Sequence, residues 1–573
     1  MTSVIERGVV DGVTALRSNG VPGRHLAALT FRVGRFDETL PTAGITHMVE
    51  HLTLSGQQEV GYRFNASVSG RYTTFYLETG NPADIATFMT AVCRGLSADH
   101  SALLDRERRI LRTEAASRGG AGALGTCLAE RYGARGPGLA NYQEFALQRA
   151  DWHEVADWRK RWFTTGNAVL WIAGDIPHGL RLSLPPGRAV FAGAVTPLDL
   201  ALPGYVAVQA RSGIGLSLLG DRSHAQYAAA HILQRRLTQV LRHEHGLSYD
   251  VQLASEDVGR DDVHWWLAAD ALPEQTPMAA HMLMTTIEAL VDRGCDAGEL
   301  AGYQRLVHEN AQQPEASVAV LQRQARALLD GRPPRSAEES SRLVAGVTVP
   351  DVATAARALR ASMIVATPGL VPAVQGRMRA LPTWSQATVT GTEHQPVSPS
   401  LALTLTTSAD GVMLTDKSGN RVTVRYAAVA ALVRWNDSRH SLIGDDGFTI
   451  MLDAAEWRDG ASVVADILRR VPWNLVVPLD EPGPQRRTAT AQGEAAGGGS
   501  KPAQGAGGNK QRRVRSPVLA RYARHGRLRW ALTIALGIVL ALSRLPMGYA
   551  CIAIGVFGLA AYEIQRYRAS RGR

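Results

Sequence analysis

Two histidines and a glutamate stand close together near the start of the chain, in the segment Ile-Thr-His-Met-Val-Glu-His-Leu that covers residues 45–52. On a helix, positions i, i+3 and i+4 share one face, so His47, Glu50 and His51 would point to the same side. Two imidazoles in this arrangement can bind one zinc ion, and the carboxylate between them lies beside the coordination position left for water. The order is His-x-x-Glu-His, the inverse of the more familiar His-Glu-x-x-His motif. The segment therefore predicts a helix that binds zinc.

A catalytic zinc ion usually has three protein ligands, so a third ligand must come from elsewhere in the chain. The charged segment 105–114 offers Glu107 and Glu114, which are seven residues apart and therefore lie two turns apart on one side of a helix. A charged run of this kind is ordinarily a solvated helix face, and the residues alone leave that alternative open. His47 and His51 could likewise be ordinary surface or core histidines.

Together these segments resemble the inverzincin family of pitrilysin, insulin-degrading enzyme and mitochondrial processing peptidase. In that family the second glutamate of a Glu-Arg-x-x-x-x-x-Glu run binds zinc, and the first glutamate supports the site. The resemblance implies that His47, His51 and Glu114 hold one Zn²⁺ per chain, with Glu107 behind them. It covers about residues 10–380.

Three more stretches agree with the family pattern. The segment 34–39 lies just ahead of the predicted zinc helix. Asn65 and Ala66 match the edge strand on which family members pair with the substrate backbone, which implies a substrate-binding role. Arg242 and Tyr249 match an Arg and a Tyr that hold the substrate carbonyl and the oxyanion in relatives. From the residues alone, Asn65 could instead cap a turn, and Arg242 and Tyr249 could be an ordinary ion-pairing residue and a packing aromatic.

The resemblance implies a zinc-dependent endopeptidase that hydrolyses peptides or a peptide precursor. Glu50 would act as the general base on a zinc-bound water and would return the proton to the leaving amine. Arg242 and Tyr249 would reach the site from the second half of the chain, so two lobes are expected to close on each other. Two alternatives remain open, a catalytically silent subunit that binds peptides or acts as a scaffold at a membrane, and a membrane-bound sensor. The segment 52–56 differs from relatives, which usually have an aromatic residue and a lysine there, and so leaves the substrate preference open.

The elements that would position these residues form an α+β fold with two tandem sheet-plus-helix lobes, an N-terminal lobe over 1–190 and a C-terminal lobe over 191–395. Residues 167–175 are an apolar run that ends in a turn, which predicts a buried strand. The second lobe repeats the order of strands and helices of the first, which suggests an internal duplication. Family members assemble such lobes into a clamshell. This chain is therefore expected to be half a clamshell, and to form a homodimer or a heterodimer with another family member.

The C-terminal third of the chain changes in composition. Short runs rich in Val, Thr, Leu and Ile, separated by turn residues, predict a small antiparallel β domain over 398–480 with one closing helix. Its sequence indicates no chemistry. Residues 481–527, rich in Gly, Ala, Gln and Pro, predict a flexible basic linker. Two apolar runs within 528–565 predict a transmembrane helical hairpin, with a single tilted helix or an interfacial hairpin as the alternative.

The distribution of charge and cysteine excludes several classes of protein. From residue 501 onward there are 14 Lys and Arg against one acidic residue, Glu563, so removing this +13 from the formal charge of +10 leaves about −3 for the first 500 residues. That balance excludes nucleic acid as a partner. The four cysteines are scattered, which argues against a disulfide scaffold or cysteine-bound zinc. Arginines on both sides of the predicted hairpin, with no N-terminal signal sequence, predict a membrane-anchored protein whose peptidase lobes are cytoplasmic.

Overall fold

The computed structural model describes residues 5–20, 23–57, 62–118, 122–191, 193, 195–208, 213–481 and 483. The predicted hairpin at 528–565 and nearly all of the predicted linker at 481–527 lie outside these residues. Within the described ranges, no helix combines the length and the apolar composition that a membrane span requires.

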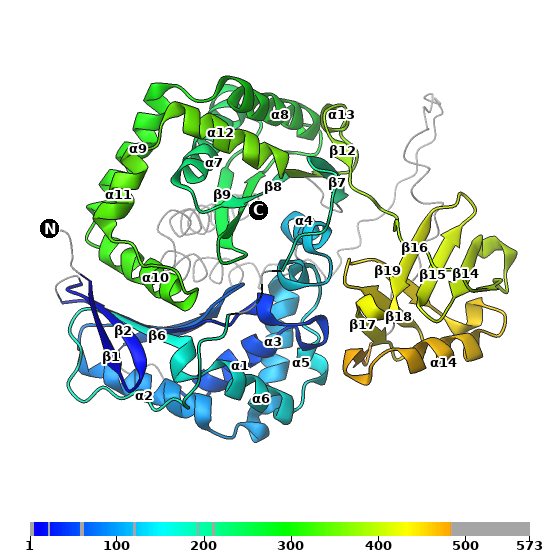
Figure 1. The fold of residues 1–573 in the computed structure, drawn as a ribbon, viewed down its shortest axis with the longest axis horizontal. Coiled ribbons are helices and arrows are strands. Elements are labelled where there is room, and N and C mark those ends of the chain that lie inside the picture. The colour runs from blue at the N-terminus through cyan, green and yellow to red at the C-terminus, as the bar shows by residue number, and fades with distance from the viewer. Residues whose placement is uncertain are drawn as a thin grey trace, which may run out of the picture. The chain divides into compact units, whose positions relative to one another are not determined.

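The first sheet has six strands in the order β1-β2-β6-β3-β5-β4. Its strands β1, β2 and β6 are labelled in Figure 1. The strands are β1 (Glu6–Val10), β2 (Val13–Ser18), β3 (His25–Phe31), β4 (Arg63–Val68), β5 (Thr73–Thr79) and β6 (Ala168–Ala173). Only β2 and β6 run parallel, and every other neighbouring pair is antiparallel. All six residues of β6 are buried, as the apolar run at 167–175 predicts. The strand β4 lies at the edge of the sheet.

Helices cover both faces of this sheet, and the alternation of side chains along β6 shows how. Leu170 and Ile172 join a core with α1 (Ile45–Leu54), α2 (Ala83–Ser97), α3 (Leu104–Arg118), α5 (Ala146–Arg149) and α6 (Trp152–Trp162). Val169 and Trp171 point to the opposite face, where they pack against α10 (Ala316–Leu329). Successive residues of a strand face opposite sides, so both faces of this central strand are apolar and covered.

The second sheet repeats the arrangement of the first. Its order is β12-β7-β11-β8-β10-β9, and five of its strands match β2-β6-β3-β5-β4 in position and direction. The strands are β7 (Gly204–Val208), β8 (Ile214–Asp221), β9 (Val251–Asp257), β10 (Asp262–Ala269), β11 (Ile364–Pro368) and β12 (Arg379–Ala380). One face packs on α7 (His224–Leu237), α8 (Thr276–Arg293) and α12 (Val349–Ala361). The matching topology supports the internal duplication that the element order suggests.

Each lobe also contributes a helix to the sheet of the other. From the second half of the chain, α10 packs on β6, β2 and β3 of the first sheet. From the first half, α4 (Gly122–Tyr132) packs on β11, β8 and β7 of the second sheet, with Cys127 against Ile364 and Ala366. The remaining helices of the second lobe are α9 (Ala297–Ala311), α11 (Ala337–Ala345) and α13 (Pro372–Gln375). This exchange joins the two lobes through apolar cores.

The β domain consists of two four-stranded sheets and one helix. The strands are β13 (Thr392–His394), β14 (Leu403–Thr407), β15 (Gly411–Asp416), β16 (Arg421–Arg425), β17 (Val429–Arg434), β18 (His440–Gly444), β19 (Thr449–Leu452) and β20 (Val476–Pro478), and the helix is α14 (Gly460–Arg470). The expectation of a wholly antiparallel domain is wrong in one strand, because β20 runs parallel to β17. A hairpin would make the two neighbouring strands antiparallel. Here the chain passes through α14 before it reaches β20, and this crossover lets β20 run parallel to β17.

A buried aspartate of the second lobe, Asp330, forms hydrogen bonds with the first lobe. The side chain of Asp330, just after α10, has no exposed surface, and it accepts hydrogen bonds from Arg71 Nη2 at 2.6 Å and Tyr72 Oη at 2.7 Å in the first lobe. Arg332 Nη2 donates a third, at 3.0 Å. Burial alone would raise the pKa of Asp330, but the charge of Arg71 and these hydrogen bonds outweigh it and lower the pKa. The ionised carboxylate therefore stabilises the folded chain at neutral pH.

Substituting Asp330→Asn leaves buried guanidinium groups without their counter-charge, so we expect the free energy of unfolding to fall by about 3–5 kcal/mol. Urea unfolding at pH 7 measures this loss. Asp175→Asn is the control, because Asp175 pairs with Arg17 at 3.0 Å but its side chain is 73% exposed, and such pairs contribute about 1 kcal/mol or less. Because the pKa of Asp330 is lowered, its contribution is present above pH ~4 and is lost as the pH falls further. Equal losses in the two variants would contradict this role.

Candidate metal centre

The helix α1 carries the His-x-x-Glu-His segment at the surface of the first core. Ile45, Met48 and Val49 pack beneath it, which fixes the opposite face of the helix. His47 and Glu50 are only 8% and 7% exposed, so their polar atoms lie in a sheltered site. The predicted helix at 45–52 is thus present.

A carboxylate fixes the N-terminus of α1. Glu38 Oε2 accepts the N–H of Gly44 at 2.8 Å, and Glu38 Oε1 accepts the N–H of Thr46 at 2.9 Å. Burial raises the pKa of Glu38 to about 7, although the two N–H donors favour its ionised form. Gly44 has a φ of 93°, a left-handed conformation that glycine adopts without strain. Within the segment 34–39, no motif marked Glu38 as the residue that caps α1.

Three side chains from α1 and α3 converge on one point. Glu114 Oε2 lies 3.7 Å from His47 Nε2 and 3.5 Å from His51 Nε2. Ligand atoms about 2.0–2.1 Å from a tetrahedral zinc ion stand roughly 3.4 Å from one another, so this spacing fits a zinc ion. Glu50 Oε2 lies 3.7 Å from His47 Nε2, beside the same point. His47, Glu50 and His51 also offer ligand atoms that all lie within 4.8 Å of one another.

A second pair of carboxylates faces the outer nitrogens of the two imidazoles. Glu107 Oε2 lies 3.5 Å from His51 Nδ1, and Glu144 Oε2 lies 3.4 Å from His47 Nδ1. A carboxylate at Nδ1 favours the tautomer with its proton there, which leaves the lone pair of Nε2 for a metal ion. Burial lowers the pKa of His51, but its hydrogen bond to Glu114 and the charges of Glu50 and Glu114 outweigh this and raise it. Glu107 was predicted to support the site, whereas no sequence motif indicated Glu144.

Asn65 and Ala66 lie on β4, the edge strand of the first sheet, next to α1. Asn65 Oδ1 accepts the N–H of Ala66 at 2.9 Å, and Asn65 stands opposite Tyr76 in the register of the neighbouring strand β5. In the described part of the sheet, β4 pairs with β5 alone. The position is therefore compatible with the addition of a peptide strand beside the candidate metal centre.

Arg242 and Tyr249 form a separate pair in the second lobe. Arg242 lies in a π-helical turn (η6, Thr238–Glu244) after α7, and its guanidinium carbon stands 5.1 Å from the centre of the Tyr249 ring. Tyr249 is 58% exposed, and its backbone N–H donates to Asp270 Oδ1. In the described chain, these contacts all lie within the second lobe, while α1 packs in the first. The expectation that the two lobes close on each other and bring Arg242 and Tyr249 to the candidate metal centre stays a prediction.

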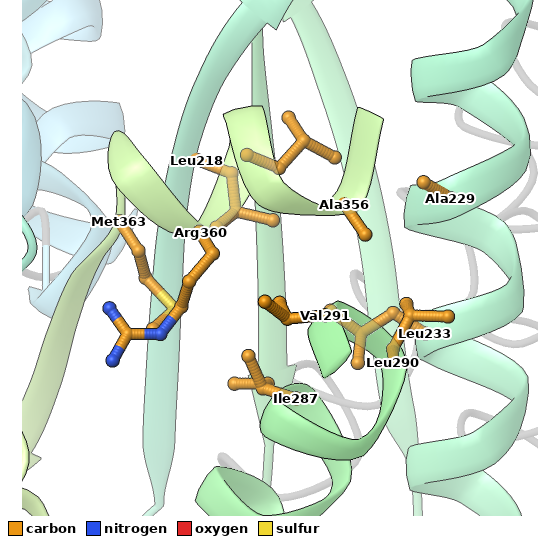
Figure 2. Close-up of a pocket in the computed structure, with 10 residues that line it drawn as sticks. Leu218, Ala229, Leu233, Ile287, Leu290, Val291, Ala356, Arg360 and Met363 are labelled. Carbon is orange, nitrogen blue, oxygen red and sulfur yellow. The ribbon is translucent and has the colours of Figure 1, made fainter. Parts of the chain in front are cut away.

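The second lobe contains an apolar cavity between β8, α7, α8 and α12 (Figure 2). Leu218, Leu233, Ile287 and Met363 are among its lining residues, and its volume is about 20 Å³. That space is comparable to one water molecule, and the lining offers almost no polar partner. The cavity is a packing defect of the core and no site for a substrate.

Comparisons with known proteins address the fold of the chain. No family model matches the chain. The chloroplastic stromal processing peptidase of Oryza sativa subsp. indica is 26% identical over 245 residues, which cover 36% of this chain and 19% of that protein. The chain thus matches about a fifth of the length of this curated relative.

Solved structures show the same fold. The first half of the periplasmic protease PqqL from Escherichia coli is similar with a TM-score of 0.53 and 16% identity, over 65% of this chain and 94% of that one. An inactive domain of peptidase M16 from Pseudomonas fluorescens is similar with a TM-score of 0.54 and 15% identity, over 66% of this chain and all (100%) of that one. The chain therefore has the fold of the M16 peptidases, and its resemblance to the family of pitrilysin and insulin-degrading enzyme is confirmed at the level of the fold.

Proposed function

We propose that this protein is a zinc-dependent endopeptidase that hydrolyses peptides or a peptide precursor. The observation that carries the proposal is the convergence of His47 Nε2, His51 Nε2 and Glu114 Oε2, with Glu50 at the same point. Three protein ligands leave one coordination position open, which distinguishes a catalytic zinc site from a closed structural one.

The roles of the chain's own residues follow from their atoms. His47, His51 and Glu114 would hold a zinc ion, which when bound would supply a lowered pKa for a water molecule and polarisation of the peptide carbonyl. The Glu50 carboxylate accepts the proton of the attacking water at Oε2 and then gives it to the leaving amine, so no covalent intermediate is needed. Glu107 and Glu144 hold the imidazoles in the required tautomer. A substrate strand paired to β4 at Asn65 and Ala66 would run past Glu50 in an extended form that admits many sequences.

The exposed Arg242 and Tyr249 pair would act on the site of a second chain. A two-fold symmetric dimer places the same surface of each chain against the other, so each Arg–Tyr pair can reach the partner's metal centre. Such a dimer, or a heterodimer with another family member, would complete the clamshell. Arg242 and Tyr249 would then stabilise the oxyanion of the tetrahedral intermediate.

A catalytically silent peptide-binding or scaffold subunit is the second candidate function. The observation in its favour is the similarity in fold to a domain described as inactive. Against it stands Glu50, since a scaffold has no need for a base beside the open coordination position.

The location of the protein is also a proposal. The apolar runs within 528–565 and their flanking arginines would anchor the chain in a membrane with the peptidase lobes in the cytoplasm. Fractionation of cells that express the full chain, with protease accessibility of the lobes, tests this placement.

Replacing Glu50→Gln keeps the size of the side chain and removes the base. We expect kcat for a mixed peptide library to fall by about 10²- to 10⁴-fold, while zinc content stays near that of the wild type. Mass spectrometry of the products and metal analysis measure the two quantities. A wild-type chain that binds zinc and cleaves no better than Glu50→Gln would favour the silent subunit.

Replacing Glu114→Ala removes the only proposed ligand outside α1. We expect zinc content to fall well below one ion per chain after dialysis against a weak chelator, because two histidines alone make an incomplete site. Asp105→Ala is the matched control, since Asp105 lies on the same helix, is 77% exposed on its side chain and pairs with Arg108. Equal zinc content in both variants would remove Glu114 from the ligand set.

Mixing two inactive variants tests whether Arg242 acts in a second chain. In a mixed dimer of Glu50→Gln with Arg242→Ala, one site is doubly defective and the other is intact. Equal subunits that exchange freely should therefore recover roughly a quarter of wild-type activity. Activity no greater than the average of the two variants would contradict a site shared between chains.

A further inference from the structure

An apolar cluster joins the β domain to the segments behind the zinc helix. The first lobe contributes Leu40, Ala134, Leu139 and Phe145, and the β domain contributes Ala431, Val433, Ile443, Val477 and Leu479. Every one of these side chains is at most 6% exposed, so the contact is a packed core and not a surface encounter. The β domain also belongs to the same compact unit as the two lobes.

Two lobe residues of this cluster, Leu40 and Phe145, stand next to the carboxylates that contact α1. Leu40 comes two residues after Glu38, which accepts the first N–H groups of the helix. Phe145 directly follows Glu144, whose Oε2 faces His47 Nδ1. A change in the packing of Leu40 or Phe145 thus occurs only one or two peptide units from the Glu38 or Glu144 carboxylate.

Polar contacts fix the β domain to the same region. Asp445, in the turn after β18, accepts the N–H of Ala134 through its backbone oxygen at 3.0 Å. The turn lies so close that a Cβ added to Gly133 would stand 2.1 Å from this oxygen, and Gly133 also has a φ of 67°. Gln143 Nε2, one residue before Glu144, donates to Glu481 Oε1 at 3.3 Å. The turn after β18 therefore packs closely on the segment that leads to Glu144.

The backbone and the stem of Glu144 are equally constrained. The N–H of Ala146 donates to the oxygen of Ala43 at 2.9 Å, which ties this segment to the entrance of α1. A Cβ on Gly44 would stand 2.6 Å from Glu144 Cβ, so the glycine makes room for the glutamate stem. These contacts leave the Glu144 carboxylate directed at His47.

We infer that Glu144 is a positioning residue for His47, and that the β domain holds it in place and thereby sets the zinc affinity of the first lobe. The inference rests on the proposed zinc function and adds a task for the β domain, whose own sequence indicates no chemistry. The β domain acts on the metal centre through the packing of Phe145 and Leu40, without supplying a ligand.

The test measures the dissociation constant for Zn²⁺ by competition with a fluorescent chelator, using the full-length chain. Glu144→Gln removes the charge and keeps the shape, and we expect the zinc dissociation constant to rise about 10- to 100-fold. Ile443→Ala removes bulk from the β-domain side of the cluster, and we expect a rise of roughly 3- to 10-fold. The double variant of Glu144→Gln with Ile443→Ala should bind zinc no more weakly than Glu144→Gln alone, because the apolar cluster acts on the site through the Glu144 carboxylate.

Leu442→Ala is the matched control. Leu442 is the neighbour of Ile443 on β18, but it faces the core of the β domain itself. We expect this variant to lower the melting temperature while its zinc affinity stays within about 2-fold of the wild type.

The outcomes separate this inference from the function on which it rests. A wild-type chain that binds no zinc would overturn both. A wild-type chain that binds zinc, together with unchanged zinc affinity in Glu144→Gln, would overturn this inference and leave the proposed zinc function standing. If Ile443→Ala raises the zinc dissociation constant no more than Leu442→Ala does, the role of the β domain in zinc affinity would be overturned.

Discussion

Two imidazole rings one turn apart on a helix can share a metal ion only if both rings are held in one orientation. In this protein the inner nitrogens of His47 and His51 face Glu114 at 3.7 and 3.5 Å, and the outer nitrogens face Glu144 and Glu107. The helix is the fixed element, because its apolar face belongs to the core and its first N–H groups are bound by a buried carboxylate. The rest of the site depends on that placement.

The fold supplies these partners from widely separated parts of the chain. Glu114 and Glu107 come from α3, Glu144 from the segment before α5, and the support behind that segment from the β domain. The exchange of α4 and α10 fixes one lobe on the other.

Local periodicity was sufficient to predict much of this arrangement. Helical spacing placed His47, Glu50 and His51 on one face, and the run of apolar residues at 167–175 predicted the buried strand β6. Such signals are local, because they depend on which residues share a face. The pairing of Glu114 with these histidines needed the family resemblance, since a charged helix face has the same pattern.

The features that escaped prediction depend on distant parts of the chain. No local pattern shows that α10 packs on the first sheet and α4 on the second, since an amphipathic helix fits either. Glu144 is a single acid, 97 residues from His47, in a segment without a motif. The parallel strand β20 depends on the crossover through α14, which short strands and turn residues do not specify.

X-ray absorption at the zinc edge of the zinc-loaded full-length chain tests the central claim most directly. We expect a site of two imidazole nitrogens and oxygen ligands at about 2.0–2.2 Å, with no sulfur neighbour. We also expect the loss of an oxygen ligand or of the bound metal in Glu114→Ala. A sulfur neighbour at about 2.3 Å, or zinc without imidazole scattering, would contradict the assignment of His47, His51 and Glu114 as the ligands.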